Sequence, residues 1–122
     1  MLGPWKDMLN NGLTTFAEEP EPTRSDCHAW SASPNYHFLS LMCGITPIES
    51  GFKRIRIAPN FGNLEWIDAK MPLKNGLINI KIKKSKNGNI NGDIELPIST
   101  TGQFEYNGKI LELTGGNNRI EL

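Results

Sequence analysis

From residue 51 onward, apolar and polar residues alternate with a period of two, and this alternation most constrains what the chain can fold into. The clearest runs of branched apolar residues lie at 55–57, 78–82 and 94–98. Between the runs stand pairs of asparagine and glycine, residues that tolerate the positive φ of tight hairpin turns: Asn75-Gly76, Asn87-Gly88, Asn91-Gly92, Asn107-Gly108 and Gly116-Asn117. Six or seven short strands at this spacing predict a small antiparallel β-sandwich over residues 51–122.

The first fifty residues follow the pattern of helices instead. Pro4 suits the first position of a helix, and Gly12 is a natural stop. Between them, apolar residues recur at helical spacing: Trp5, Met8 and Leu9. The chain is therefore predicted to be α+β, with a short helical segment over residues 1–50 followed by the sandwich.

A second helix is predicted from about Asp26 to Met42, after a loop that contains two prolines. Pro34 lies inside this stretch and leaves two outcomes open: it kinks the helix, or it starts a new helix capped by Ser33. The two helices carry more apolar surface than one face of a small sandwich would cover: Trp5, Trp30, Phe38, Leu39, Leu41 and Met42. Helices of this kind usually belong to a larger bundle, so the chain is predicted to be part of a larger protein.

The charge balance excludes two classes of partner. Thirteen basic residues match thirteen acidic ones, so no net charge attracts nucleic acid or an anionic membrane. The lysines at 81–86 alternate with apolar residues and are predicted to lie on a solvated strand and turn. The sequence contains no window of 18 apolar residues, so no membrane span is predicted. Residues 1–9 lack an apolar stretch of the length found in signal peptides. A periplasmic and a cytoplasmic location of a longer parent both stay open.

The two cysteines, Cys27 and Cys43, are predicted to be buried thiols. If the segment between them is largely helical, a rise of ~1.5 Å per residue places them ~24 Å apart. A disulfide needs Cα atoms within roughly 7 Å, so no bridge between them is expected. Neither a CxxC nor an HxxxH spacing occurs, so no metal site is predicted, and no cofactor is expected.

Several blocks in a fixed order carry a family resemblance. They are residues 12–18 (Gly-Leu-Thr-Thr-Phe-Ala-Glu), 25–30 (Ser-Asp-Cys-His-Ala-Trp), 43–45 (Cys-Gly-Ile), Pro47 with Gly51-Phe52, and the strand 55–57 running into Ala58-Pro59. Over roughly residues 3–80 the chain resembles the end of the bacterial α-L-rhamnosidases. In that family an (α/α)6 barrel of six helical hairpins carries catalysis, and a small β-sandwich follows it. The resemblance implies that residues 1–50 are the remnant of such a barrel and that the chain is inactive alone.

The resemblance also implies roles for individual residues. Glu18 matches the family's general base, which in an inverting glycosidase activates water while a second carboxylic acid protonates the leaving oxygen. That second group is expected far upstream of this chain. His28 matches a histidine that contacts the sugar. Trp30 stands near it in the sequence and is a candidate lining residue of the pocket, although the resemblance assigns it no role. The family often has tryptophan where Ala17 stands here, and the loop after Glu18 is short, so the preferred sugar stays open.

Without the resemblance, the same residues have simpler interpretations. Glu18 would be a solvated acid in a proline-rich loop, and His28 would be a hydrogen-bonded structural histidine. Trp5 and Trp66 are predicted to pack in a core or an interface.

Three functions follow from these observations. In the first, the chain is the C-terminal part of a glycoside hydrolase that acts on terminal α-L-rhamnosyl groups, with a carbohydrate substrate and the missing barrel as partners. In the second, it is a non-catalytic sandwich that binds carbohydrate or stabilises a partner domain, although only 8% of residues are aromatic. In the third, the protein stands alone and forms a homo-oligomer through its helices.

Overall fold

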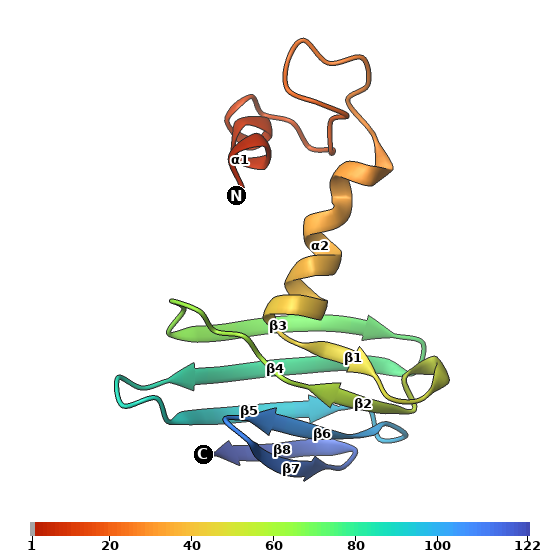
Figure 1. Cartoon of the computed structure of the whole chain (residues 1–122). Helices are drawn as coiled ribbons and strands as arrows, with labels where there is room; N and C mark the ends of the chain where they lie inside the picture. The colour runs from red at the N-terminus through yellow and green to blue at the C-terminus, as the bar shows by residue number, and fades with distance from the viewer. Residues whose placement is uncertain (1) are drawn as a thin grey trace. The chain divides into compact units, whose positions relative to one another are not determined.

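The computed structural model describes residues 2–122, which form two compact units (Figure 1). The first unit ends at His37 and contains three short helices: α1 (Gly3–Asn10), the 3-10 helix η1 (Ala29–Ala32) and α2 (Ser33–His37). The second unit, Phe38–Leu122, begins with one turn of π-helix, η2 (Phe38–Met42), and continues into the strands. The sequence analysis places a boundary between residues 50 and 51, where the helical end of a barrel would meet the sandwich of a longer enzyme. The division into two compact units does not test this boundary, which stays a prediction.

The predicted first helix is confirmed. Pro4 lies in its first turn, where a missing N–H loses no helical hydrogen bond, and the chain leaves the helix at Asn11. Gly12 then takes a φ of 75°, which only glycine adopts without strain.

The second helix begins at Ala29, three residues later than predicted. His28 is extended, with φ −131° and ψ 120°, because its N–H donates to the Phe16 carbonyl at 2.7 Å instead of joining a helix. Of the two outcomes left open for Pro34, the second is closer: an α-helical segment starts at Ser33 and takes the proline in its first turn. Ser33 is itself helical, however, and so does not cap this segment.

The eight strands of the second unit form two four-stranded sheets in two layers (Figure 1). The strands are β1 (Ile45–Pro47), β2 (Arg54–Ile57), β3 (Trp66–Leu73), β4 (Gly76–Lys84), β5 (Ile90–Leu96), β6 (Thr101–Tyr106), β7 (Lys109–Leu113) and β8 (Gly116–Glu121), with a 3-10 turn η3 (Ser50–Phe52) before β2. One sheet has the order β1-β2-β6-β7 and the other β3-β4-β5-β8. Every pair is antiparallel except β2–β6, so the predicted α+β sandwich is confirmed with one parallel pair.

The core lies between the two sheets and is built from the alternation seen in the sequence. In β4 the inward positions Ile78, Ile80 and Ile82 are buried, while Lys81 and Lys83 face solvent as predicted. Phe104 of β6 is fully buried and pairs in register with Ile57 of β2. Burying such side chains is the main driving force that holds the two sheets together.

Three of the five predicted turns are confirmed. Asn107-Gly108 joins β6 to β7 with φ values of 48° and 77°, the positive pair that a two-residue hairpin turn requires. Asn75-Gly76 and Asn87-Gly88 lie at the β3–β4 and β4–β5 hairpins.

The other two predicted turns are wrong. Gly116-Asn117 begins β8. Asn91-Gly92 lies inside β5, where a Cβ on Gly92 would sit 2.0 Å from the Lys81 carbonyl oxygen. This glycine therefore permits a close backbone approach inside the sheet instead of a turn.

The prediction for the two cysteines is half right. Cys43 is buried, and its burial raises the pKa of the thiol, whereas Cys27 is exposed in the extended stretch before η1. Both thiols are free. Among the described residues, no helix is long and apolar enough to cross a membrane.

Candidate functional site

The loop that carries Glu18 is closed by two backbone hydrogen bonds within the first unit. The N–H of His28 donates to Phe16 O at 2.7 Å, and the N–H of Glu18 donates to Ser25 O at 2.8 Å. Between these two bonds Ala17 is almost completely buried. The loop thus has a fixed base, and Glu18 and His28 both belong to it.

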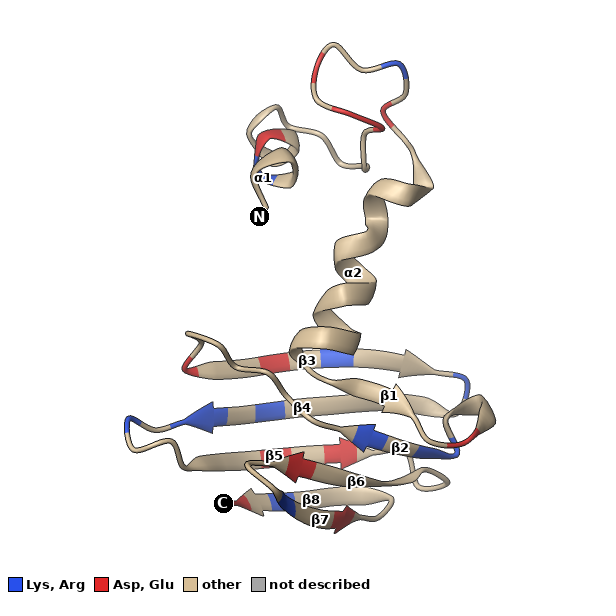
Figure 2. Ribbon diagram, in the orientation of Figure 1, with Lys and Arg blue, Asp and Glu red and all other residues tan. Residues whose placement is uncertain are grey.

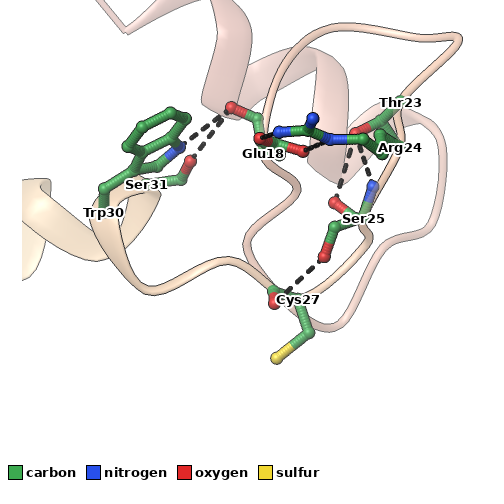
Figure 3. A network of polar contacts seen from close by, with 7 residues as sticks. All are labelled: Glu18, Thr23, Arg24, Ser25, Cys27, Trp30 and Ser31. Atoms are coloured by element: carbon green, nitrogen blue, oxygen red, sulfur yellow. Dashed lines mark hydrogen bonds and ion pairs between the residues drawn. The ribbon is translucent and has the colours of Figure 1, made fainter.

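Two side chains from η1 hold the backbone of Glu18 from the other side (Figure 3). The indole N–H of Trp30 donates to the Glu18 carbonyl oxygen at 3.1 Å, and the Ser31 hydroxyl donates to the same oxygen at 3.5 Å. The carbonyl of Ser31 in turn accepts the indole N–H of Trp5 at 2.7 Å. These bonds connect the loop to both helical segments of the unit.

The carboxylate of Glu18 is paired with the guanidinium of Arg24. Nε of Arg24 donates to Oε2 at 2.9 Å, and Nη2 forms a second bond and ion pair with Oε1. The Glu18 side chain is only 4% exposed, whereas that of Arg24 is 79% exposed, so the arginine lies over the acid. A planar guanidinium on both oxygens of a carboxylate is the strongest arrangement of such a pair.

Arg24 favours the ionised form of this acid. Its hydrogen bonds lower the pKa of the Glu18 carboxyl group, while burial opposes the shift and the charge of His28 adds to it. The same hydrogen bonds raise the pKa of the Arg24 guanidinium, because they favour its charged form. Glu18 is therefore held as a carboxylate, and the same shift makes it a weaker proton acceptor than an unpaired glutamate.

The structure brings the three predicted site residues together. The rings of His28 and Trp30 lie 4.6 Å apart between centroids, tilted by 49°, and Trp30 is bonded to Glu18. Trp30 is 65% exposed, and its contact with Glu18 is to the backbone carbonyl of that residue. Figure 3 shows the thiol of Cys27 pointing away from these contacts.

Sequence reasoning missed Arg24. An arginine six residues after a glutamate, across a loop with two prolines, has no motif of its own. Closure of the loop by the bonds from Glu18 N to Ser25 O and from His28 N to Phe16 O brings the two side chains face to face. The other acids of the loop differ from Glu18: Glu19 is exposed, and Glu21 accepts the N–H of Thr23 at 3.0 Å.

Within residues 2–122, no group of three or more His, Cys, Asp or Glu side chains could hold a metal ion. The arrangement offers one charged carboxylate, one imidazole and one exposed indole. In chemical terms, it can accept a proton and hold a ligand by ring contacts.

A comparison with protein families matches residues 44–115 to the "Bacterial alpha-L-rhamnosidase C-terminal domain". This match covers most of the second unit and more than half of the chain. The chain belongs to this family. The family is thus that of α-L-rhamnosidases, which are glycoside hydrolases. No match was found among curated proteins.

Solved structures share the fold of this rhamnosidase C-terminal domain and of the residues before it. An α-L-rhamnosidase of Streptomyces avermitilis, in complex with L-rhamnose, is similar with a TM-score of 0.75 and 16% identity over 97% of this chain. An α-L-rhamnosidase of Aspergillus terreus is similar with a TM-score of 0.76 and 18% identity over 97% of this chain. An α-L-rhamnosidase of Dictyoglumus thermophilum is similar with a TM-score of 0.73 and 17% identity over 94% of this chain. The chain spans only 14%, 15% and 17% of those three chains, respectively.

Replacing Arg24 by glutamine is expected to raise the pKa of Glu18 toward the ordinary glutamate value, because the variant loses the charged hydrogen bonds that favour the carboxylate. In the native chain the folded pKa is the lower one. The ion pair between Glu18 and Arg24 therefore stabilises the fold at pH values above the ordinary pKa of glutamate. This stabilisation is lost as the pH falls through the lowered pKa of the folded state. An NMR titration of the side-chain carboxyl carbons measures the shift.

Glu105 provides the internal control for this titration. Its pKa is lowered by a separate hydrogen bond from Arg56 at 2.6 Å, in the second unit. Its titration should be the same in the native chain and in Arg24→Gln. An unchanged Glu18 titration in the variant would show that Arg24 does not control the acid.

Proposed function

We propose that this chain is the C-terminal part of an inverting glycoside hydrolase that acts on terminal α-L-rhamnosyl groups, with Glu18 as its general base. The observation that carries the proposal is the fixed position of Glu18, whose carboxylate is bonded by Arg24 and whose backbone carbonyl is bonded by Trp30 and Ser31. These contacts lie in a chain that belongs to a rhamnosidase family.

Glu18 would act on the water that attacks the anomeric carbon. Each carboxylate oxygen has two lone pairs, so the bonds to Arg24 leave acceptor sites for a water molecule. In an inverting mechanism the water loses its proton to this base while a carboxylic acid on the opposite face of the sugar protonates the leaving oxygen. The two carboxyl groups then stand roughly 6.5–9.5 Å apart, which leaves room for the water.

His28 and Trp30 would hold the sugar ring against Glu18. The tilted pair presents an aromatic face and a ring nitrogen next to the acid, and these suit the C–H face and the hydroxyls of a pyranose. The roles of these two residues and of Glu18 remain proposals that rest on the resemblance and on this geometry.

The general acid and the rest of the pocket would come from another part of the enzyme. Two helical residues expose large apolar side chains that a barrel of helices would cover: Leu9 at 74% and Leu41 at 64%. This exposure supports the missing barrel as the principal partner. A single carboxylate cannot supply both the acid and the base, so the chain alone is expected to be inactive.

Incubation of the chain with 4-nitrophenyl α-L-rhamnoside tests this expectation. No release of nitrophenol above the buffer rate is expected from a sample whose NMR spectrum shows a folded chain. The result against the proposal is turnover by the native chain that disappears in Glu18→Gln, because this would place a complete catalytic site within these residues.

A further inference from the structure

The outward face of the sheet β3-β4-β5-β8, here called the outer face, carries an aromatic residue among alternating charges. The register of the strands places Trp66 opposite Lys83, and Lys83 opposite Asn91. The next outward row runs from Asp68 through Lys81, Asp93 and Arg119. Figure 2 shows both signs of charge along these strands.

These residues surround a hollow of about 280 Å³, which lies within the second unit. Its lining includes the first residues of both rows: Trp66, Asp68, Lys81, Lys83, Asn91 and Asp93. Sites for drug-sized ligands measure roughly 300–1,000 Å³, so this hollow has the size for one small ring.

Trp66 is unusual among the three tryptophans of the chain. Trp5 and Trp30 each donate their indole N–H to a backbone carbonyl, whereas that of Trp66 has no acceptor within the described part of the chain. The side chain of Trp66 is also 63% exposed, so it is not the core residue that the sequence analysis allowed. It offers a free aromatic face and a free donor at the edge of the hollow.

The polar groups around Trp66 are of two kinds. Asp93 is fixed by an ion pair with Arg119 at 3.0 Å. Within residues 2–122, Asp68, Lys81 and Lys83 make no side-chain hydrogen bond or ion pair, so their donors and acceptors are free for a ligand. Three cations and two acids line the hollow, so its charges largely cancel and an anion is not strongly favoured.

We propose that this hollow on the outer face binds one pyranose ring of a saccharide. The C–H face of the sugar would lie on the indole of Trp66, because aromatic faces are electron-rich and attract C–H edges. Its hydroxyls would donate to Asp68 and accept from Lys83, since a hydroxyl is both donor and acceptor. A ring with an apolar face and alternating donors and acceptors around its rim fits this surface better than an anion or a purely apolar ligand.

This proposal stands independently of the catalytic role of Glu18, because the hollow belongs entirely to the second unit. The other occupant to be tested is a protein surface. A second, mainly apolar hollow of about 410 Å³ also includes Trp66 in its lining, together with Phe38, Leu39 and Met42.

An NMR titration of the isotope-labelled chain with L-rhamnose, and in parallel with D-galactose, tests the proposal. At about 10 mM sugar, weak binding should shift the Trp66 indole signal and the backbone amides of Lys83 and Asn91, and the shifts should saturate. Trp66→Ala should weaken binding by about tenfold or more, and Asp68→Asn should weaken it less, since it keeps the shape of the hollow. Ile110→Ala, which removes an exposed side chain from the other sheet, should leave the shifts unchanged.

Three results would overturn the proposal. The first is the absence of any shift with either sugar. The second is shifts confined to His28 and Trp30, which would favour the proposed catalytic site and leave the outer face unused. The third is unaltered binding by both Trp66→Ala and Asp68→Asn, whose dispersed spectra would show that they are folded.

Discussion

Replacement of Glu18 by alanine in the enzyme encoded by the whole reading frame is expected to lower kcat by about 10²–10⁴-fold, the usual contribution of a general base. The variant keeps the general acid and loses only the group that activates water. Azide needs no deprotonation to attack. It should therefore restore turnover of an aryl α-L-rhamnoside and yield a glycosyl azide of inverted configuration, identifiable by its NMR spectrum.

Glu19→Gln is the matched control for this experiment. The two acids are adjacent in the same loop, but Glu19 is exposed and makes no ion pair within the described residues, whereas Glu18 is bonded to Arg24. The control should keep kcat within about twofold, since it touches no reacting group. A Glu18→Ala enzyme with native kcat, or a loss that is equal in the two variants, would remove Glu18 from the mechanism.

Phe104→Ala is expected to lower the free energy of unfolding of the sandwich by about 3–5 kcal/mol, the usual range for a fully buried phenylalanine. The ring fills the space between the two sheets, and neighbours such as Ile55 and Ile57 are themselves fully buried and have little freedom to close the cavity. Chemical denaturation followed by far-ultraviolet circular dichroism measures the change.

Ile110→Ala is the control, because Ile110 lies on the adjacent strand β7 with its side chain 58% exposed. Its effect should stay within about 0.5 kcal/mol. If Phe104→Ala does not fold at all, Phe104→Leu measures the same site with a smaller cavity. Equal stabilities of Phe104→Ala and Ile110→Ala would contradict the position assigned to the core.

The fold was largely predictable because its strands carry strong alternation. The isoleucines of β2 and β4 occupy every buried position of these strands, and the period of two alone identifies both strands. Strand β3 shows no clear run of branched apolar residues, because its inward residues include the small Ala69 and because Pro72, a residue rare in strands, lies within it. Proline is tolerated there because β3 is at the edge of its sheet.

The local pattern gave less information about the site. In composition, the loop around Glu18 is a solvated acidic segment, and only the family resemblance singled out this residue. The structure shows why composition fails: the side chain is covered by Arg24 and its backbone is held by Trp30, six and twelve residues away. These contacts depend on loop closure, which no periodicity encodes.

The most direct test of the central claim is the DNA sequence immediately upstream of the first codon of this chain. The account predicts an open reading frame that continues upstream and encodes the paired helices of a barrel, including an acid able to act opposite Glu18. An in-frame stop codon directly before the first codon, with a ribosome-binding site of its own, would contradict it. The chain would then be a complete small protein, without the barrel that the catalytic proposal requires.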